Sequence, residues 1–219
     1  HAMRESVGRI IETLRSVRKQ KKIFLFLIAF FFFIDGVYTI IDMATAYGSA
    51  LGLDSTGLLL ALLVTQFVAF PFSILFGRLA EKYDTGKLIL TCIAAYTGIT
   101  VFAVFMKAQW QFWVLAIFVG MFQGGIQALS RSYFAKIVPP ERSGEYFGLM
   151  DICGKGASFM GTTVVGLASQ AFGSINIGVS AIVFLFLAGA LFFMKTEHSG
   201  SESMKNQENI VMGQQMFHD

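Results

Sequence analysis

Charged residues are scarce in this chain of 219 residues. They make up 14% of the sequence, whereas a typical soluble domain carries about 25%. Hydrophobic residues reach 55%, and phenylalanine alone occurs 24 times. The short alternating segments of a membrane β-barrel are missing as well, which leaves the α-helix as the architecture that satisfies every backbone group in lipid. The composition therefore predicts a helical membrane protein.

Cysteine and histidine are also rare, and their positions exclude several kinds of chemistry. The two cysteines, Cys92 and Cys153, fall within long apolar stretches, where we expect small buried hydrophobic side chains rather than a disulfide or a metal site. The three histidines, His1, His198 and His218, lie outside those stretches. An intramembrane serine protease needs a base such as histidine near its serine, so we expect no catalytic activity and no cofactor.

Six apolar stretches are each long enough to cross about 30 Å of hydrocarbon, which takes roughly 20 residues. They lie at residues 23–47, 57–77, 88–106, 110–130, 146–172 and 175–194. The sequence therefore predicts an all-α polytopic membrane protein with six transmembrane helices over residues 23–194.

Lysine and arginine are distributed unevenly among the connections. Seven precede the first apolar stretch, and the connections after the second and fourth stretches are also basic, whereas the other three connections hold Lys107 alone. Basic residues mark cytoplasmic loops, so we expect both termini to lie in the cytoplasm. The net charge of +3 then reflects topology, and it indicates no nucleic-acid partner.

The segments on either side of the apolar region differ in character. Residues 1–22 place apolar side chains at helical spacing among arginines, which predicts an amphipathic helix at the cytoplasmic interface; a flexible basic leader is the alternative. Residues 195–219 are polar, and we expect a disordered cytoplasmic tail. The opening His1-Ala2-Met3 is typical of a cloning remnant. The apolar residues of the expected helix are Val7, Ile10, Ile11, Leu14 and Val17.

A short charged segment, Gly77–Lys87, connects the second and third apolar stretches. It reads GRLAEKYDTGK and contains five charges and two glycines. It resembles the loop signature that the major facilitator superfamily repeats on the cytoplasmic side, between helices 2 and 3 and between helices 8 and 9. A one-residue insertion at Asp84-Thr85 separates it from the usual spacing. The residues that carry the resemblance are Gly77, Glu81, Lys82, Gly86 and Lys87.

The resemblance implies a gating role for this segment. We expect Glu81 to accept hydrogen bonds from neighbouring helix N-termini. Arg78 and Lys82 would pair with acidic groups across the cytoplasmic face, so that a latch favours one access state. We place Arg131, in the next basic connection, in the same group. Charge that only sets the topology is the alternative.

A second region, Gln123–Gly161, is similar to the tenth and eleventh helices of one facilitator branch. This branch contains the autophagy-linked vacuolar amino-acid effluxer of fungi and many bacterial members. The resemblance covers nearly all of residues 23–194 and implies the C-terminal half of a secondary transporter, with two inverted three-helix repeats. It further implies export of a solute such as an amino acid across a bacterial plasma membrane. The shared features are Gln123-Gly124, Ser130-Arg131-Ser132, Pro139-Pro140, Phe147-Gly148 and Lys155-Gly156.

Polar residues also interrupt the first apolar stretch, where ionisable groups are costly and usually face a cavity or a partner. Asp35, Tyr38, Asp42 and Thr45 follow one face of the expected helix. We expect Asp35 to contact the solute or to titrate with a coupled proton. An aspartate tied to a neighbouring helix is the alternative.

The fourth and fifth stretches carry a second set of polar residues. Asp151 and Lys155 are four residues apart and can pair on one helix face. Lys155 would bind a carboxylate of the solute or exchange partners during transport; a fixed structural pair is the alternative. Gln123 and Gln127 are one turn apart, and we expect them to hydrogen-bond a polar solute.

Two further classes of membrane protein deserve comparison with the transporter. A channel needs a recognisable filter or a ring of charge, and neither is visible. A complete six-helix protein that dimerises into a transporter is the main alternative, because facilitators are built from two parallel halves. We therefore expect a small solute, the lipid bilayer, and either an N-terminal six-helix half or a second copy of this chain as partners.

Overall fold

Seven long helices account for nearly all of the structure. The computed structural model describes the backbone of residues 2–216 and the side chains of residues 8, 10–174 and 176–200. The described residues form no strand, so the predicted all-α membrane architecture is confirmed. The helices are α1 (Ala2–Lys19), α2 (Lys21–Ala50), α3 (Ser55–Lys82), α4 (Thr85–Val104), α5 (Gln109–Ile137), α6 (Ser143–Phe172) and α7 (Ile175–Met216), with the short 3₁₀ turn η1 (Pro140–Arg142) before α6.

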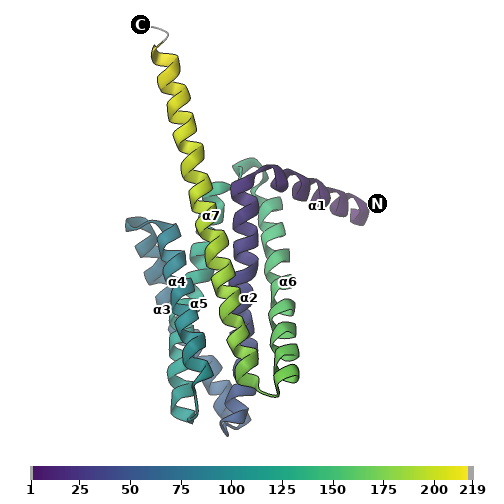
Figure 1. Cartoon of the computed structure of the whole chain (residues 1–219), viewed down its shortest axis with the longest axis vertical. Helices are drawn as coiled ribbons and strands as arrows, with labels where there is room; N and C mark the ends of the chain where they lie inside the picture. Colours follow the sequence, from purple (N-terminus) through teal and green to yellow (C-terminus); the bar gives the residue numbers. More distant parts are fainter. Residues whose placement is uncertain (1, 217–219) are drawn as a thin grey trace.

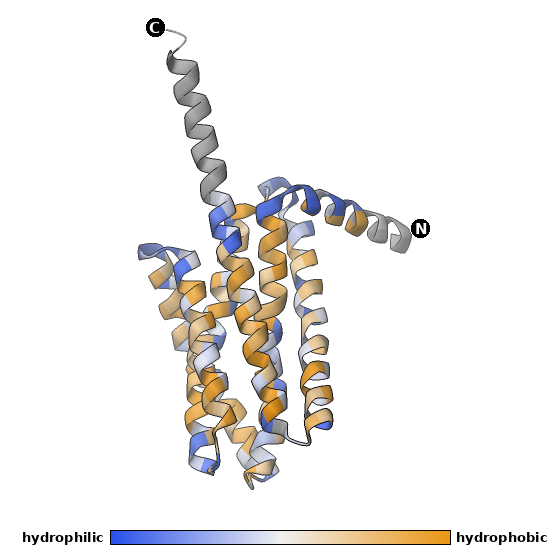
Figure 2. Cartoon of the chain, in the orientation of Figure 1, coloured by the Kyte–Doolittle hydropathy of each residue, from blue (hydrophilic) through white to orange (hydrophobic). Residues whose placement is uncertain are grey.

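Helices α2 to α7 stand side by side, and α1 lies across one end of them (Figure 1). At this end α2, α4 and α6 begin and α3 and α5 finish. Figure 2 shows that hydrophilic residues gather here, whereas the middle of the bundle is mostly hydrophobic. Because lysines and arginines are concentrated here, we call it the basic end of the bundle.

Five of the described helices are long and apolar enough to cross a membrane: α2, α3, α4, α5 and the part of α7 from Asn176 to Gly200. The sixth expected span, residues 146–172, corresponds to α6, which is 30 residues long but more polar. Asp151, Lys155 and a series of serines, threonines and glycines lower its hydropathy. α6 nevertheless packs along α2 and α7 within the bundle.

The helix contacts follow the pattern expected of two three-helix repeats. α2 packs on α6 and α7, α5 packs on α3 and α4, and α4 packs on α7. Exchanging α2 with α5, α3 with α6 and α4 with α7 converts the contacts of α2 into those of α5 and leaves the contact of α4 with α7 unchanged. The exception is α6 on α7, because its counterpart, α3 on α4, is a slight contact. Successive helices alternate in direction, so two groups of three are inverted relative to each other.

Aromatic rings fill the space around α2 near the basic end. Phe26 is fully buried, and its ring centroid lies 5.2 Å from that of Tyr133 and 5.3 Å from that of Phe134, both on α5. Phe193 of α7 meets the same ring edge-on at 6.2 Å. Offset and edge-to-face pairs of this kind add to the energy of burial. They join α2, α5 and α7 into one core.

The structure differs from the sequence-based expectations at two places. The charged segment Gly77–Lys87 is helical except at Tyr83 and Asp84, because α3 continues to Lys82 and α4 begins at Thr85. Residues 195–216, part of the segment 195–219 that was expected to be disordered, continue α7, and residues 217–219 lie outside the described part of the chain. The first turns after residue 195 are held in place, since Glu197 accepts a hydrogen bond from the Tyr133 hydroxyl.

Close approach of α3 and α5 depends on glycine. A Cβ atom at Gly120 would lie 2.7 Å from the carbonyl oxygen of Thr65, and one at Gly124 would lie 2.7 Å from that of Ala69. Both obstacles are backbone atoms, which cannot move aside as a flexible side chain can. Small residues permit close helix packing in membranes in this way.

This contact yields a prediction about stability. We expect Gly124→Ala to lower the free energy of unfolding by about 1–3 kcal/mol, the usual cost of overpacking. Gly98→Ala on α4 is the matched control, because a Cβ there meets nothing within 4 Å and alanine favours the helix. Thermal unfolding of the purified variants in detergent measures the difference, and equal midpoints for the two variants would contradict the packing argument.

Candidate functional site

An ion pair joins α5 to α6 across the front of α2. The Nη2 atom of Arg131 donates to Oδ1 of Asp151 at 2.8 Å, and both side chains are about half exposed, at 57% and 49%. α5 and α6 each pack on α2, and Tyr38 of α2 lies within electrostatic reach of both charges. The expected pairing of Asp151 with Lys155 on α6 is therefore not observed. Arg131 takes that place from the neighbouring helix α5.

Asp42 of α2 lies about one turn beyond Tyr38 on this helix, further from the basic end. Its side chain is exposed, and its Oδ2 atom accepts a hydrogen bond of 3.1 Å from the Ser158 hydroxyl of α6. One turn further, the Thr45 hydroxyl donates to the backbone oxygen of Asp42 at 3.2 Å. The sequence analysis missed Ser158, although its distance of three residues from Lys155 places it on the same helix face.

Lys155 is exposed on α6, and it takes part in neither of the two ion pairs found among the described residues. Gln127 lies one turn from Arg131 on α5 and is half-buried. Gln123 is half-buried too, and its Oε1 atom is buried without a hydrogen-bond partner in the described part of the chain. Such an atom is costly to leave unpaired, which suits a group that pairs with a ligand or water.

We define the polar surface as the set of side chains on α2, α5 and α6 that these contacts, and helical spacing from the contacting residues, place together. The structure thus assembles five of the seven predicted solute-site residues on one surface, with Arg131 added from the gating group. The members are Tyr38, Asp42, Gln127, Arg131, Asp151, Lys155 and Ser158.

Asp35 has a different environment from the polar surface. It is 0% exposed, and its Oδ1 atom accepts hydrogen bonds from the Gly161 amide at 2.8 Å and from the Thr39 hydroxyl at 3.4 Å. A Cβ atom at Gly161 would collide with both side chains. Glycine therefore lets α6 approach α2 closely enough for a backbone amide to reach the carboxylate. This favours the second interpretation of Asp35, an aspartate tied to a neighbouring helix.

The two carboxylate oxygens of Asp35 have different surroundings. The Oδ2 atom is buried and has no hydrogen-bond partner among the described residues. A buried ionised carboxylate with one free oxygen is costly, whereas protonation removes the charge. The geometry is therefore compatible with a role in proton binding as well as with helix pairing.

The charged segment Gly77–Lys87 lies at the basic end, and most of its residues are exposed. Asp84 caps α4 by accepting a hydrogen bond of 3.0 Å from the Lys87 amide. Asp84, which the sequence comparison treated as part of an insertion, thus accepts the hydrogen bond from a helix N-terminus that was expected of Glu81. An aspartate directly before a helix is a recognisable N-cap signal. Gly86 is buried against the carboxylate of Glu197. The exposed residues of the segment are Gly77, Arg78, Glu81, Lys82, Tyr83, Asp84 and Lys87.

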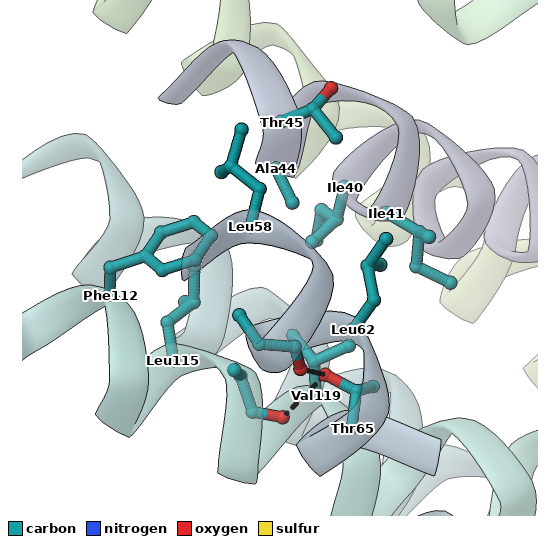
Figure 3. A pocket seen from close by; sticks show the side chains of 12 residues that line it. Ile40, Ile41, Ala44, Thr45, Leu58, Leu62, Thr65, Phe112, Leu115 and Val119 are labelled. Atoms are coloured by element: carbon teal, nitrogen blue, oxygen red, sulfur yellow. Dashed lines mark hydrogen bonds between the residues drawn. The ribbon is translucent and has the colours of Figure 1, made fainter. Parts of the chain in front are cut away.

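A separate pocket lies between α2, α3 and α5 in the half of the bundle away from the basic end (Figure 3). Isoleucine, leucine, alanine and phenylalanine side chains provide most of its lining. Its two hydroxyl groups belong to Thr45 and Thr65, and the Thr65 hydroxyl already donates to the backbone oxygens of Ala61 and Ala116, at 2.9 and 3.3 Å. The pocket therefore offers little to a charged solute.

The contact between Asp35 and Gly161 predicts how two substitutions differ. Asp35→Ala removes the acceptor for the Gly161 amide and leaves a void, so we expect a loss of about 1–3 kcal/mol in the free energy of unfolding. Asp35→Asn keeps an oxygen of the same shape and should stay close to the parent protein. Asp42→Ala, which removes an exposed aspartate from the same helix, is the control. Thermal unfolding in detergent compares the three, and a midpoint of Asp35→Ala equal to that of Asp42→Ala would refute the buried contact.

Comparison with known proteins identifies the family of this chain. Residues 1–205 match the family described as "Vacuole effluxer Atg22 like". The chain is 43% identical over 209 residues to the MFS-type transporter YxiO of Bacillus subtilis, covering 95% of this chain and 49% of that protein. It is 23% identical over 220 residues to the autophagy-related protein 22-2 of Aspergillus niger, covering 92% of this chain and 37% of that protein.

Autophagy-related protein 22 of Cryptococcus neoformans is similar as well, with 26% identity over 198 residues, covering 83% of this chain and 35% of that protein. The chain thus spans between a third and a half of the length of these relatives. The match to the family model extends over nearly the whole chain and includes all the helices of the polar surface. The chain therefore belongs to the Atg22-like branch of the major facilitator superfamily of transporters.

Proposed function

We propose that this chain forms one half of a secondary transporter and that the polar surface lines the pathway of a small polar solute. The observation that carries the proposal is the exposure of four charged residues on helices of membrane-spanning length. A charge directed at lipid is costly, so such groups face a water-filled cavity or a protein partner. The four residues are Asp42, Arg131, Asp151 and Lys155.

The charges of the polar surface favour a zwitterionic solute. Lys155 is an exposed cation outside both ion pairs of the described residues, and Asp42 is an exposed carboxylate with one hydroxyl partner. A carboxylate of the solute would bind Lys155, and its ammonium group would bind Asp42. An amino acid carries both groups. The vacuole effluxer description of the family supports transport in the direction of export.

Coupling to protons would use Asp35. Its carboxylate lies at the contact between α2 and α6, directly behind the polar surface, and one of its oxygens has no partner among the described residues. A change in the angle between α2 and α6 would expose this carboxylate or bury it more deeply. Proton uptake would then follow the position of α6, which is the coupling that alternating access requires.

The gate would lie at the basic end, which we assign to the cytoplasmic side of a plasma membrane because basic residues mark that side. The Arg131–Asp151 pair closes the polar surface at this end. Arg78, Glu81 and Lys82 are exposed nearby and form no ion pair among the described residues. They are free to contact a second half of the transporter in one access state and to release it in the other.

The polar surface needs a cover, because it cannot face lipid. Since the chain spans at most about half the length of its relatives, we propose that a second six-helix body faces α2, α3, α5 and α6, as in transporters built from two parallel halves. An N-terminal half of the same protein is the preferred candidate. A second copy of this chain would provide a similar surface.

This arrangement predicts that the chain alone does not transport. Monomeric protein in proteoliposomes should give no uptake of radiolabelled amino acids above protein-free vesicles, because one wall of the pathway is missing. Joining the chain to a six-helix N-terminal half, for instance that of the Bacillus relative, should restore uptake. Measurement of the oligomeric state by light scattering separates the candidates for the cover. Uptake by strictly monomeric chain would refute the proposal.

A second prediction concerns the solute charge that Lys155 binds. In the assembled transporter, Lys155→Ala should weaken binding of a zwitterionic amino acid by about tenfold or more, since loss of one charge-assisted contact corresponds to at least about 1.4 kcal/mol. Binding of the matching amine without a carboxylate should change much less. Lys107→Ala, which removes an exposed cation from the connection before α5, is the control. Isothermal titration calorimetry measures the affinity of each variant for the two ligands. Equal affinities of Lys155→Ala and Lys107→Ala for the amino acid would remove Lys155 from the pathway.

A further inference from the structure

A groove runs beneath α1 at the basic end of the bundle. α1 forms its roof, α2 its floor and α6 its side wall, and the volume of the groove is about 600 Å³. Apart from one arginine, the side chains that line it are apolar or weakly polar. Representative residues are Leu14 and Arg18 of α1, Phe24 and Phe31 of α2, and Leu149 and Cys153 of α6.

Hydrogen bonds hold the roof of the groove in place. The Tyr146 hydroxyl of α6 lies 3.2 Å from the Ser16 hydroxyl and accepts a bond of 3.0 Å from Nε2 of Gln20. One turn earlier on α1, the Thr13 hydroxyl donates to Oε2 of Glu145 at 3.1 Å. Val17, between these contacts, is buried at 2% exposure. α1 is therefore docked on α6, and the space beneath it is a feature of the fold.

The inner end of the groove lies about one bilayer leaflet below the start of α2. Along α2 its lining extends from Phe24 to Phe32, and Phe32 lies eleven residues after Lys21, where the helix begins. At 1.5 Å per residue the distance from Lys21 to Phe32 is about 16 Å. The hydrocarbon of a leaflet is about 15 Å thick, half of the usual 30 Å. An acyl chain that enters at the basic end would thus fill the groove to the middle of the membrane.

The chain that leads from α1 into α2 is strongly cationic, and Arg18 lines the groove itself. Arg15, Arg18, Lys19 and Lys21 are all exposed within seven consecutive residues, and none of them takes part in the two ion pairs of the described residues. Figure 2 shows this hydrophilic stretch directly above the hydrophobic start of α2. Basic pockets next to apolar helix surfaces are the sequence-readable form of anionic lipid recognition. The chemistry at the entrance is therefore complementary to a phosphate headgroup.

We propose that the groove is a binding site for one anionic phospholipid. Its acyl chain would lie along the phenylalanines of α2 beneath α1, and its headgroup would bind Arg18 with Arg15 and Lys21 beside it. A zwitterionic lipid fits the apolar part equally well, but the ammonium group of its headgroup offsets the phosphate, so the cations attract it less. The bound lipid would add to the hydrogen bonds that hold α1 on α6, and the site does not depend on which solute the protein transports.

Native mass spectrometry of the purified full chain tests the proposal. The probes are phosphatidylglycerol and phosphatidylcholine with identical acyl chains, titrated separately into delipidated protein. We expect tighter binding of one phosphatidylglycerol, and we expect Arg18→Gln to weaken it by about fivefold, the factor that corresponds to about 1 kcal/mol per basic residue near anionic lipid. Lys87→Gln is the matched control, because Lys87 is an exposed cation at the same end of the bundle but on α4.

Fluorescence quenching locates the acyl chain independently. A tryptophan introduced by Phe31→Trp should be quenched more strongly by brominated phosphatidylglycerol than by brominated phosphatidylcholine in mixed vesicles. The native Trp110 and Trp113, at the start of α5 and far from the groove, provide the internal reference and should respond equally to both lipids. The proposal would be overturned if the two lipids bound equally well, or if Arg18→Gln and Lys87→Gln lost the same affinity for phosphatidylglycerol. It would also be overturned if the quenching of Phe31→Trp were the same with both headgroups.

Discussion

Helix α2 is the element on which the rest of the structure depends. Its apolar window is 67% buried, more than that of any other apolar helix among the described residues, because α5, α6 and α7 all pack against it. Near the basic end, aromatic rings join α2 to α5 and α7. Further along α2, the hydrogen bond from the Gly161 amide to Asp35 joins it to α6. α5 and α6 hardly touch each other. They are neighbours because they share α2, and the polar surface exists because their side chains meet in front of it.

The cost of polar groups in a membrane explains how the two aspartates of α2 differ. Both are directed at α6, as their separation of seven residues requires. At Gly161 the missing Cβ brings α6 close enough to enclose Asp35 and to supply a backbone donor. At Ser158 a hydroxyl side chain meets Asp42 and the carboxylate stays exposed. One helix contact therefore produces a buried carboxylate and an accessible one, which suits a division between coupling and solute binding.

The basic end combines two different uses of positive charge. Lys22 lies over the Tyr133 ring at 5.7 Å, and Lys136 donates to the Thr85 hydroxyl at 2.9 Å, so these cations are part of the packing between helices. The cations of α1 and of the charged segment after α3 remain exposed instead. Exposed charge at a membrane surface interacts with lipid headgroups and with other protein bodies. In the arrangement that we propose, the cations of α1 would bind lipid and those of the segment after α3 would meet a second half.

The sequence by itself determined the membrane class, the positions of the helices and the family, because hydropathy and short motifs are local properties of the chain. It also identified most of the polar surface, since helical spacing places Tyr38 with Asp42 and Asp151 with Lys155. The partners could not be predicted. Arg131 rather than Lys155 pairs with Asp151, Asp84 rather than Glu81 caps a helix, and Asp35 lies buried against Gly161. Each of these outcomes depends on how closely two helices approach and on which side chain spans the gap, and only tertiary packing decides those distances.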